Sequence, residues 1–564
     1  MNEAAPLPAL GFGVGIVGHR ANRIDDAEKV RGLILQIVEV VDGALDEAAA
    51  GGFYPVGRRP LRLVSALAEG ADRLAASAAI DAGVRLEVVL PFVAAEYRKD
   101  FANQASCDEF DRLLDRAETV LVLDGKADER QRAYEAAGMT LLDNCDLLIA
   151  VWDGGPGRGR GGTREVIEEA TRRAIPVIVI DPAGNAATVR SGGPGAGPMR
   201  LEDVPELALA ELPSLIFAEV GVTEGPASAA EWLRLAEPPP EPMIHSAYPL
   251  LLKLAGIRSW RTPRPVAADE APRETSIQPV RQAFAWWDQV AIRAAQAFRS
   301  AVIVNFALAA LAVVLAATSL LAQDAKWLFV LAEVITILLL LANTVSAGRR
   351  RWQERWLEAR QVAELLRVCT LLRNVGIGRG IADPGQGGLL GWYAGAFARS
   401  VSLERLDLSD PRAAAAPLIA EVRSQAQWNE ATARRMHLAA RRIERFGEAL
   451  FAVVLLAAIG WLLLDIVVPS TAYELRYVLT AVTAGLPAIA TASYGIRVIL
   501  DFEGIAQRSG RIAAGLHASL AKWEAEVPSA ARLQEFARRA ADIMLGDIAA
   551  WRLLAEGRRL TLPG

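Results

Sequence analysis

Four apolar stretches, arranged in two closely spaced pairs, dominate the hydrophobic pattern of this chain. Residues 301–322 contain no charged side chain, and residues 327–347 contain a single acid, Glu333. The second pair covers residues 449–469 and 477–496. Each stretch is long enough to cross a hydrocarbon core of about 30 Å as a helix. The pattern predicts an all-α membrane domain with four transmembrane helices in two hairpins. Helices buried in a soluble core are the alternative interpretation.

Basic residues are distributed unevenly around these stretches. The short turns inside the two pairs contain only Lys326 and Arg476, whereas the other flanks carry Arg349, Arg350, Arg351, Arg355, Arg441, Arg442, Arg445 and Arg497. The positive-inside rule therefore predicts that both termini and the segment between the pairs face the cytoplasm. Glu333, Asp465 and Arg476 then lie near the outer ends of the helices, where anchoring at the interface is a commoner role than an ion pathway.

The two pairs resemble copies of one unit. Phe298 precedes the first apolar stretch and Phe446 precedes the third, 148 positions later. Arg360 and Arg508 follow the two pairs with the same separation. A constant offset favours duplication of a helix, a hairpin and a helix, although coincidence between two arginine-rich helices is an alternative. The predicted modules are residues 276–410 and 411–564.

Two further segments of the helical half have amphipathic patterns that allow two interpretations. In residues 349–372, Trp352, Trp356 and Val362 belong to one apolar stripe of an arginine-rich helix. Such a helix either lies on anionic lipid or packs against copies of itself below the membrane. The stretch "GLLGWYAGAFARS", within residues 376–409, is either a membrane-surface helix or an assembly contact.

The first 182 residues have a different pattern. Short apolar runs such as "GVGIVG", "LRLVSAL", "LEVVLPF", "ETVLVL", "DLLIAVW" and "IPVIVID" alternate with helical stretches. This alternation predicts an α/β, Rossmann-like parallel sheet with helices on its faces. We expect a core over residues 11–182 in a cytosolic domain of residues 1–275. Within residues 183–280, "GNAATVRSGGPGAGP" and "EPPPEP" are linker-like, whereas "HSAYPLLLKLAG" predicts a helix that completes this domain.

Polar residues and glycines follow the ends of several predicted strands. In open sheets of this kind, ligands bind beyond the carboxyl ends of the strands, so these residues are candidates for one crevice. They are Gly18, His19 and Arg20 after the first strand, Ser65, Glu69, Gly70 and Asp72 after the second, Pro91, Glu96 and Tyr97 after the third, and Asp153 and Gly154 after the "DLLIAVW" strand.

The stretch "WDGGPGRGRGGTREVIEEA" contains six glycines between Gly154 and Gly162, directly before a predicted helix. Glycine allows close approach of the main chain to a ligand, and a helix N-terminus offers unpaired N–H groups that favour anions. We therefore place a phosphate against Gly161, Gly162 and Thr163. The alternative is a flexible surface loop beside an ordinary helix cap at Thr163.

Composition narrows the function classes. The formal net charge is −5 and the isoelectric point is near 5.7, so direct nucleic-acid binding is not expected. The three cysteines and four histidines are scattered, which argues against a disulfide framework and a metal site. The mean hydropathy of +0.23 is high for a chain with 23% charged residues, as expected when a soluble part and a membrane part share one chain.

The ordered motifs "GHR", "SALAEGADRLAA", "VLPF", "EYRKDF", "NCDLLIAVWDG" and "GGTREVIEEA" resemble the SLOG superfamily, Rossmann-like nucleotide-binding domains that include the LOG phosphoribohydrolases, DprA-type proteins and the N-terminal domain of TRPM channels. Gly161, Gly162 and Thr163 followed by Glu165 are similar to the PGGxGTxxE signature of the LOG enzymes. The membrane half resembles the SLATT modules, two-span helical effectors fused to nucleotide sensors in bacterial anti-phage systems, through its hairpins and the "WLEARQVAELLR" helix.

These resemblances imply a membrane effector in a bacterial inner membrane, with a SLOG-like domain that binds a nucleotide-derived second messenger, such as an ADP-ribose-like compound or a cyclic nucleotide. Binding would trigger pore formation or membrane disruption by a homo-oligomer. The alternative is a membrane-tethered phosphoribohydrolase acting on nucleoside monophosphates, with Glu165 as its acid or base. LOG enzymes also use an arginine in an "ERK"-like stretch; this chain has none, and Arg130 and Arg132 are the nearest candidates.

Overall fold

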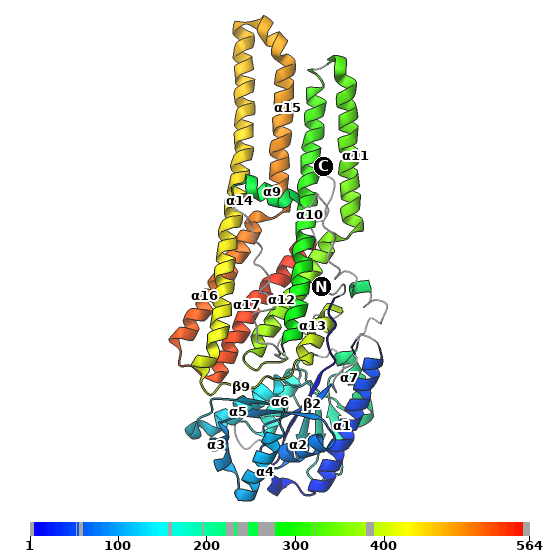
Figure 1. Cartoon of the computed structure of the whole chain (residues 1–564), viewed down its shortest axis with the longest axis vertical. Coiled ribbons are helices and arrows are strands. Elements are labelled where there is room, and N and C mark those ends of the chain that lie inside the picture. The colour runs from blue at the N-terminus through cyan, green and yellow to red at the C-terminus, as the bar shows by residue number, and fades with distance from the viewer. Residues whose placement is uncertain are drawn as a thin grey trace.

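The computed structural model shows an α/β domain at one end of the molecule and long helices that extend away from it (Figure 1). It describes residues 5–51, 54–55, 60–155, 161–193, 197–221, 231–233, 246–257, 277–321, 323–379 and 389–556. Gly157 and Gly159 of the glycine-rich stretch lie outside these residues, as do the "EPPPEP" segment and most of the expected linker before residue 277.

The N-terminal domain is built on a mixed nine-stranded sheet with the order β8-β7-β6-β5-β1-β2-β3-β4-β9. The strands are β1 (Phe12–Gly18), β2 (Leu61–Ser65), β3 (Arg85–Leu90), β4 (Thr119–Val122), β5 (Leu147–Val151), β6 (Val177–Ile180), β7 (Ala187–Arg190), β8 (Glu206–Leu207) and β9 (Leu406–Asp407).

The six predicted strands, β1 to β6, pair in parallel. Beyond the predicted core the sheet continues with two strands that were not predicted: β7 pairs antiparallel with β6, and β8 pairs antiparallel with β7. Only six residues connect β6 and β7, and a parallel crossover needs a dozen or more. The connection is a tight turn in which the Asp181 carboxylate accepts hydrogen bonds from the main-chain N–H groups of Ala183, Asn185 and Ala186.

Helices cover both faces of the sheet. The helices α1 (Ala27–Ala50), α2 (Ala71–Asp81), α4 (Gln104–Asp115) and α7 (Leu212–Val220) share one apolar core with the sheet, and α5 (Arg130–Leu142) and α6 (Thr163–Arg172) share the other. The short α3 (Ala94–Tyr97) follows β3. The chain runs outward from β1 to β4 and then returns to β5 on the other side of β1. The strand order therefore reverses between β1 and β5, where ligands bind in open sheets.

The C-terminal half is helical apart from β9. Its helices are α10 (Gln278–Thr318), α11 (Lys326–Arg349), α12 (Trp352–Arg373), α13 (Leu389–Ser400), α14 (Pro411–Val467), α15 (Pro469–Ile499), α16 (Phe502–Ala525) and α17 (Ala530–Glu556), preceded by α9 (Ala247–Leu254). In Figure 1, α10 lies beside α11 and α14 beside α15.

Four helical segments in the described residues are long and apolar enough to cross a membrane, and each overlaps one of the four predicted stretches. The change in environment along α14 is clear. Ala415, Val422, Asn429, Met436 and Ile443 are buried at seven-residue intervals, a spacing typical of coiled-coil packing. From Phe446 onward most of the large apolar side chains of α14 are exposed, and the others are half-buried. Such an exposed apolar surface is suited to lipid, so the part of α14 that is able to cross a membrane begins near this residue. We call the packed part of the helical half, between this level and the α/β domain, the stalk.

Both helical units bend in the same way after their second long apolar helix. Arg351 separates α11 from α12 with φ 50° and ψ 39°, and Asp501 separates α15 from α16 with φ 53° and ψ 41°. A single left-handed residue at the corresponding junction of each unit is consistent with the proposed duplication. The two bends are 150 positions apart, two more than the offset of the sequence match.

The helical half also completes the sheet domain. β9 adds to the sheet beside β4, and α12, α13 and α17 share the apolar core of α5 and α6. The predicted alternatives for α12 and α13, lipid contact or contact between copies, are therefore wrong for most of their surface, because both helices are buried inside this chain. "HSAYPLLLKLAG" contains a helix, α9, but it packs against the helical half and does not complete the sheet domain.

Asp143, at the end of α5, contacts three segments where the α/β domain meets the helical half, a region that we call the junction. Its carboxylate pairs with Arg173, which follows α6, at 2.7 Å and with Arg538 of α17 at 2.5 Å. Its carbonyl oxygen accepts hydrogen bonds from the main-chain N–H groups of Gly378 and Arg379. The Asp143 side chain is only 5% exposed, so removal of either arginine would leave a buried charge poorly compensated.

We predict that Asp143→Ala lowers the free energy of unfolding of the full chain by about 3 kcal/mol, because two arginines lose their buried partner. Glu430→Gln, which removes an exposed pair with Arg434 on α14, should cost less than about 0.5 kcal/mol. Thermal unfolding of the two variants in the same detergent measures the difference. Equal, small effects would contradict the assignment of Asp143 as a central junction residue.

Candidate functional site

His19 and Asp153 meet at the point where the strand order reverses. His19 directly follows β1, and Asp153 lies two residues after β5. The His19 Nε2 atom is 3.1 Å from Asp153 Oδ1 and 3.2 Å from the Asp153 main-chain nitrogen. Arg23 pairs with the other oxygen of the carboxylate. A hydrogen bond from the Gly155 N–H, followed by the interaction with His19, lowers the pKa of Asp153 and thus favours its ionised form.

The loop after β2 packs directly under the loop after β1. Gly70 has a φ of 105°, and a Cβ atom there would clash with the His19 carbonyl oxygen and lie 2.6 Å from the Ala21 nitrogen. A Cβ atom on Gly18 would lie 2.9 Å from the Val151 side chain. Both glycines thus allow main-chain segments to approach closely. Their role is to bring the predicted loops together, and no ligand contact is needed to explain them.

Ser65 and Asp72 are buried beneath the same loop. The Ser65 hydroxyl accepts a hydrogen bond from the Leu67 N–H at 3.0 Å, and the Asp72 carboxyl accepts main-chain hydrogen bonds from Ala68 and Ala66. Burial raises the pKa of Asp72 to about 7, against the opposing effect of these hydrogen bonds. The two side chains hold the loop in place from below and do not face an opening.

Glu69 faces the first turn of α4. Its Oε1 atom accepts hydrogen bonds from the Ser106 hydroxyl and, at 2.9 Å, from the Ala102 N–H. Burial acts against ionisation, but these two hydrogen bonds outweigh it and lower the pKa of Glu69. Arg20 and Arg73 lie close enough to contribute in the same direction.

The segment after β3 forms a second charged group with the start of α5. Arg130 pairs with Glu96 at 2.6 Å and also with Asp100, which accepts a hydrogen bond from the Tyr134 hydroxyl. A hydrogen bond from Lys99 lowers the pKa of Glu96, and Arg130 adds to the effect. Tyr134 was not predicted as a site residue, and Arg130 was named only through the resemblance to the LOG enzymes, because both belong to α5, the helix after β4, and not to a strand end.

Pro91 and Tyr97 form the floor of this second group. The Pro91 carbonyl accepts a hydrogen bond from the Gly125 N–H at 3.1 Å. Tyr97 is 1% exposed and packs against Phe92, Phe101 and neighbouring rings. Its hydroxyl has no hydrogen-bond partner within the described part of the chain.

The glycine-rich stretch reaches this same edge of the sheet, but its first donor is already occupied. Gly161, with φ 78°, packs on the main chain of Tyr134 and Glu135, so close that a Cβ atom would lie 2.6 Å from the Glu135 nitrogen. The Gly161 N–H donates to the Glu165 carboxylate at 2.6 Å. Glu165 is the third residue of α6 after the capping residue Gly162, and an acid at this position commonly bonds back to the preceding main chain.

One donor of the predicted phosphate position, the Gly161 N–H, is therefore already bonded to a carboxylate of the protein itself. Gly162 and Thr163 lie beside it, with Thr163 as the first residue of α6. Gly154, with φ 76°, has open space where a Cβ atom would be. The predicted residues thus follow strand ends at one edge of the sheet, and Glu165 engages the Gly161 N–H that was expected to bind the ligand.

Arg20 differs from the other charged residues of the edge. It is exposed, and no hydrogen bond or ion pair engages its guanidinium within the described residues. Glu69 and Tyr134 both lie within its electrostatic range, one on each side of the site. An unengaged arginine between two loops is suited to pair with a phosphate or carboxylate ligand.

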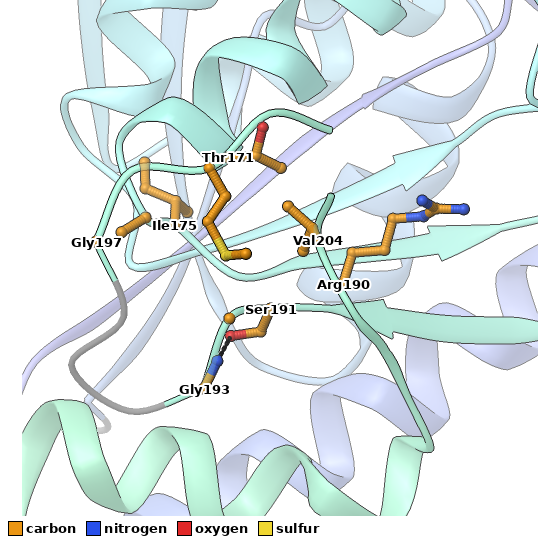
Figure 2. A pocket seen from close by; sticks show the side chains of 10 residues that line it. Thr171, Ile175, Arg190, Ser191, Gly193, Gly197 and Val204 are labelled. Carbon is orange, nitrogen blue, oxygen red and sulfur yellow. Dashed lines mark hydrogen bonds between the residues drawn. The ribbon is translucent and has the colours of Figure 1, made fainter. Parts of the chain in front are cut away.

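A small cavity lies elsewhere, between the end of α6 and the antiparallel edge of the sheet. Figure 2 shows Thr171 and Ile175 on one side and Arg190, Ser191 and Gly193 on the other. Its volume of about 20 Å³ holds about one water molecule. The cavity contains none of the predicted site residues and is too small for a nucleotide, so we base the functional argument on the strand-end residues.

The first prediction for this site concerns Gly70. Gly70→Ala should lower the free energy of unfolding by about 3 kcal/mol, because the main chain is held in a conformation that side chains disfavour and the new Cβ clashes with the first loop. Gly154→Ala is the matched control, since it also has a positive φ but open space; its cost should be about 1 kcal/mol. Chemical unfolding of both variants tests the contrast. Equal costs would show that the two loops are not in contact.

The second prediction concerns the pH dependence of stability. Because the pKa of Asp72 in the folded chain, about 7, lies above its ordinary value, the folded state binds a proton that the unfolded state has released. Stability should therefore fall as the pH rises from about 4 to about 7. Asp72→Asn should reduce this fall, as measured by thermal unfolding at several pH values. A pH profile unchanged by the substitution would contradict the burial of this carboxyl.

Comparison of the chain with models of known protein families, with curated proteins and with solved structures found no match in any of the three.

Proposed function

We propose that this protein is a nucleotide-responsive membrane effector. In this proposal the α/β domain is a SLOG-like, Rossmann-like sensor that binds a nucleotide-derived second messenger from the cytoplasm. The four apolar helices form SLATT-like hairpins in a bacterial inner membrane, and several copies of the chain together open a pore or disrupt the bilayer in response.

The observation that carries the proposal is the convergence of loops from four strands at the point where the sheet reverses. His19 contacts Asp153, Gly70 packs against the His19 loop, and Gly161 packs against Tyr134. The edge thus combines a helix N-terminus, an unengaged arginine and acidic groups of lowered pKa. Phosphate is suited to the first two features, and ribose hydroxyl groups are suited to the carboxylates as hydrogen-bond acceptors.

Glu165 suggests how a ligand is sensed. A ligand phosphate has the same sign and a similar acceptor geometry as the carboxylate that Gly161 now holds. Binding at the α6 N-terminus would displace Glu165 and bring a group of higher charge to the helix end. The displaced Glu165 side chain would then be free to contact the ligand. The site would thus have two states: in one the Gly161 N–H binds Glu165, and in the other it binds the ligand phosphate.

The path from this site to the stalk is short. α6 has ten residues, so its two ends are about 15 Å apart. Beyond its far end, Arg173 binds Asp143, which also binds Arg538 of α17. α17 packs against α16 and α12, the helices that follow the two pairs of apolar helices. A shift of α6 would therefore act on the stalk directly. A full change in state, from 1:99 to 99:1, needs a difference in ligand affinity worth about 5.5 kcal/mol.

The alternative function is a membrane-tethered phosphoribohydrolase with Glu165 as the acid or base. Two observations weigh against it. Glu165 accepts a hydrogen bond from the main chain of Gly161, just before its own helix. Arg130, the nearest candidate for the second catalytic residue of the LOG enzymes, is already held by Glu96 and Asp100. Both groups would have to be released before they acted on a substrate.

We predict that Arg20→Ala weakens binding of ADP-ribose by tenfold to a hundredfold, because a charge-assisted hydrogen bond contributes about 1.5–3 kcal/mol. Arg116→Ala is the control, since Arg116 is also exposed but lies between α4 and the start of β4, at the opposite edge of the sheet. Calorimetric titration of the full chain in detergent measures both. Equal affinities for the two variants would remove Arg20 from the site.

A separate experiment distinguishes the sensor from the enzyme. The full chain is incubated with AMP, and free adenine is measured; the full chain is needed because α12, α13 and α17 complete the core of the α/β domain. The proposal predicts no adenine above the level of a Glu165→Gln variant. Adenine release that disappears in Glu165→Gln would establish the alternative function.

A further inference from the structure

The short helix α9 lies across the long helices at the level where they leave the stalk (Figure 1). Its Tyr248 N–H donates to the Ser300 hydroxyl on α10 at 3.1 Å, and the Tyr248 ring stacks on Phe502 at the start of α16. At the other end of α9, the Ala255 carbonyl accepts a hydrogen bond from Arg442 of α14. Ser300 directly precedes the first predicted span and Phe502 follows the fourth, so α9 is fixed at the cytoplasmic boundary of the membrane region.

The inner face of α9 is buried and its outer face is apolar. Tyr248 and Leu252 pack into the core beneath the helix. Leu250 and Leu254, one turn apart on the outer side, are 54% and 77% exposed. Their apolar surface adjoins that of the exposed spans, where Phe446 and Phe451 of α14 are also about half exposed. A leucine pair exposed at this height is suited to the acyl-chain boundary of a bilayer.

Arginines without a protein partner lie at the same height. We define the arginine belt as Arg349, Arg441 and Arg445, which are exposed and make no ion pair within the described residues. Four acids near this boundary already have a basic partner: Glu354 with Arg351, Glu444 with Arg497, Asp501 with Arg508 and Glu503 with His437. A fifth, Glu448, is exposed. Arg442 and Arg299 add positive charge. Arg442 donates to the Ala255 carbonyl, and the Arg299 guanidinium lies over the Tyr248 and Trp356 rings. The belt therefore has a clear excess of positive charge.

We propose that α9 and the arginine belt form a binding surface for anionic phospholipids of the cytoplasmic leaflet. Leu250 and Leu254 insert among the upper acyl chains, and the belt arginines pair with lipid phosphate groups, with which arginine forms bidentate hydrogen bonds. Juxtamembrane basic residues are attracted to anionic leaflets in this way. α9 contacts α10, α14 and α16 together, so lipid bound here restrains both helical units at once. The proposal requires membrane insertion of the helices but does not require nucleotide binding.

The position of α9 is tested with an environment-sensitive fluorophore on Leu254→Cys, in the full chain reconstituted in vesicles of phosphatidylcholine and phosphatidylglycerol. Cys145 and Cys369 are buried, so a Cys107→Ser background limits labelling to the new site. The control is Val527→Cys, which is similarly exposed, at 74%, but lies between α16 and α17 in the stalk. Lipid-borne quenchers should reduce the signal at residue 254 at least threefold more than at residue 527. Equal quenching would overturn the proposal.

The lipid preference is tested with spin-labelled phosphatidylglycerol and phosphatidylcholine on the unlabelled full chain. The fraction of lipid whose motion the protein restricts should be at least twofold higher for phosphatidylglycerol. R441Q/R445Q should remove at least half of this excess, and R116Q/R412Q, which changes two exposed arginines outside the belt, should leave it intact. An excess that survives in R441Q/R445Q, or that falls equally in the control, would overturn the assignment. Neither measurement uses a nucleotide, so failure of the sensor proposal would leave these results interpretable.

Discussion

The architecture depends on a sheet face that its own domain covers only in part. α5 and α6 occupy this face together with α12, α13 and α17 of the helical half, in one continuous apolar core. Separation of the two halves would expose this core to water at a cost of about 25 cal/mol for each Å² of apolar surface. The sheet domain and the stalk are therefore one cooperative unit, joined further by β9 and by the buried hydrogen bond from Arg62 of β2 to the Arg399 carbonyl at 2.6 Å.

This shared core connects the strand-end site to the helical half. A loop on an independent domain moves without consequence for the rest of a chain, whereas α6 has its N-terminus at the candidate site and its C-terminus at the Asp143 junction. The site can also exchange partners on ligand binding, since the N–H of Gly161, before α6, is bonded to Glu165 and the nearby Arg20 is unengaged. Exchange of an internal carboxylate for an external phosphate is a simple way to connect ligand binding to movement of this helix.

The features that were predictable from sequence are those that depend on a long, regular pattern of hydrophobic residues. The absence of charge over residues 301–322 places a span without knowledge of its neighbours, and alternation of apolar runs with helices places β1 to β6. The antiparallel β7 was not predicted because "ATVR" is short and polar and its direction depends on the turn at Asp181. An amphipathic helix has the same pattern whether it meets lipid or protein, which is why α12 and α13 remained ambiguous.

The candidate site was predictable at the level of loops, because parallel strands end at one edge, but not at the level of side chains. The roles of Ser65 and Asp72 depend on burial, which strand-end position does not reveal. Glu165 did have a signal, since an acid three residues after a helix cap commonly bonds back to the main chain. Glu165 also matches the catalytic motif of the LOG enzymes, which suggests a different role. In the structure the Glu165 carboxylate accepts a hydrogen bond from the Gly161 N–H.

The most direct test of the account is hydrogen exchange on the full chain with and without three probes: AMP, ADP-ribose and a cyclic dinucleotide. The account predicts that at least one probe slows exchange at residues 18–24 and 161–165 and also changes exchange at the junction, in residues 376–379 and 530–538. Unchanged exchange at the strand ends with all three probes would contradict the nucleotide site. Protection at the strand ends without any change at the junction would contradict the coupling of that site to the membrane helices.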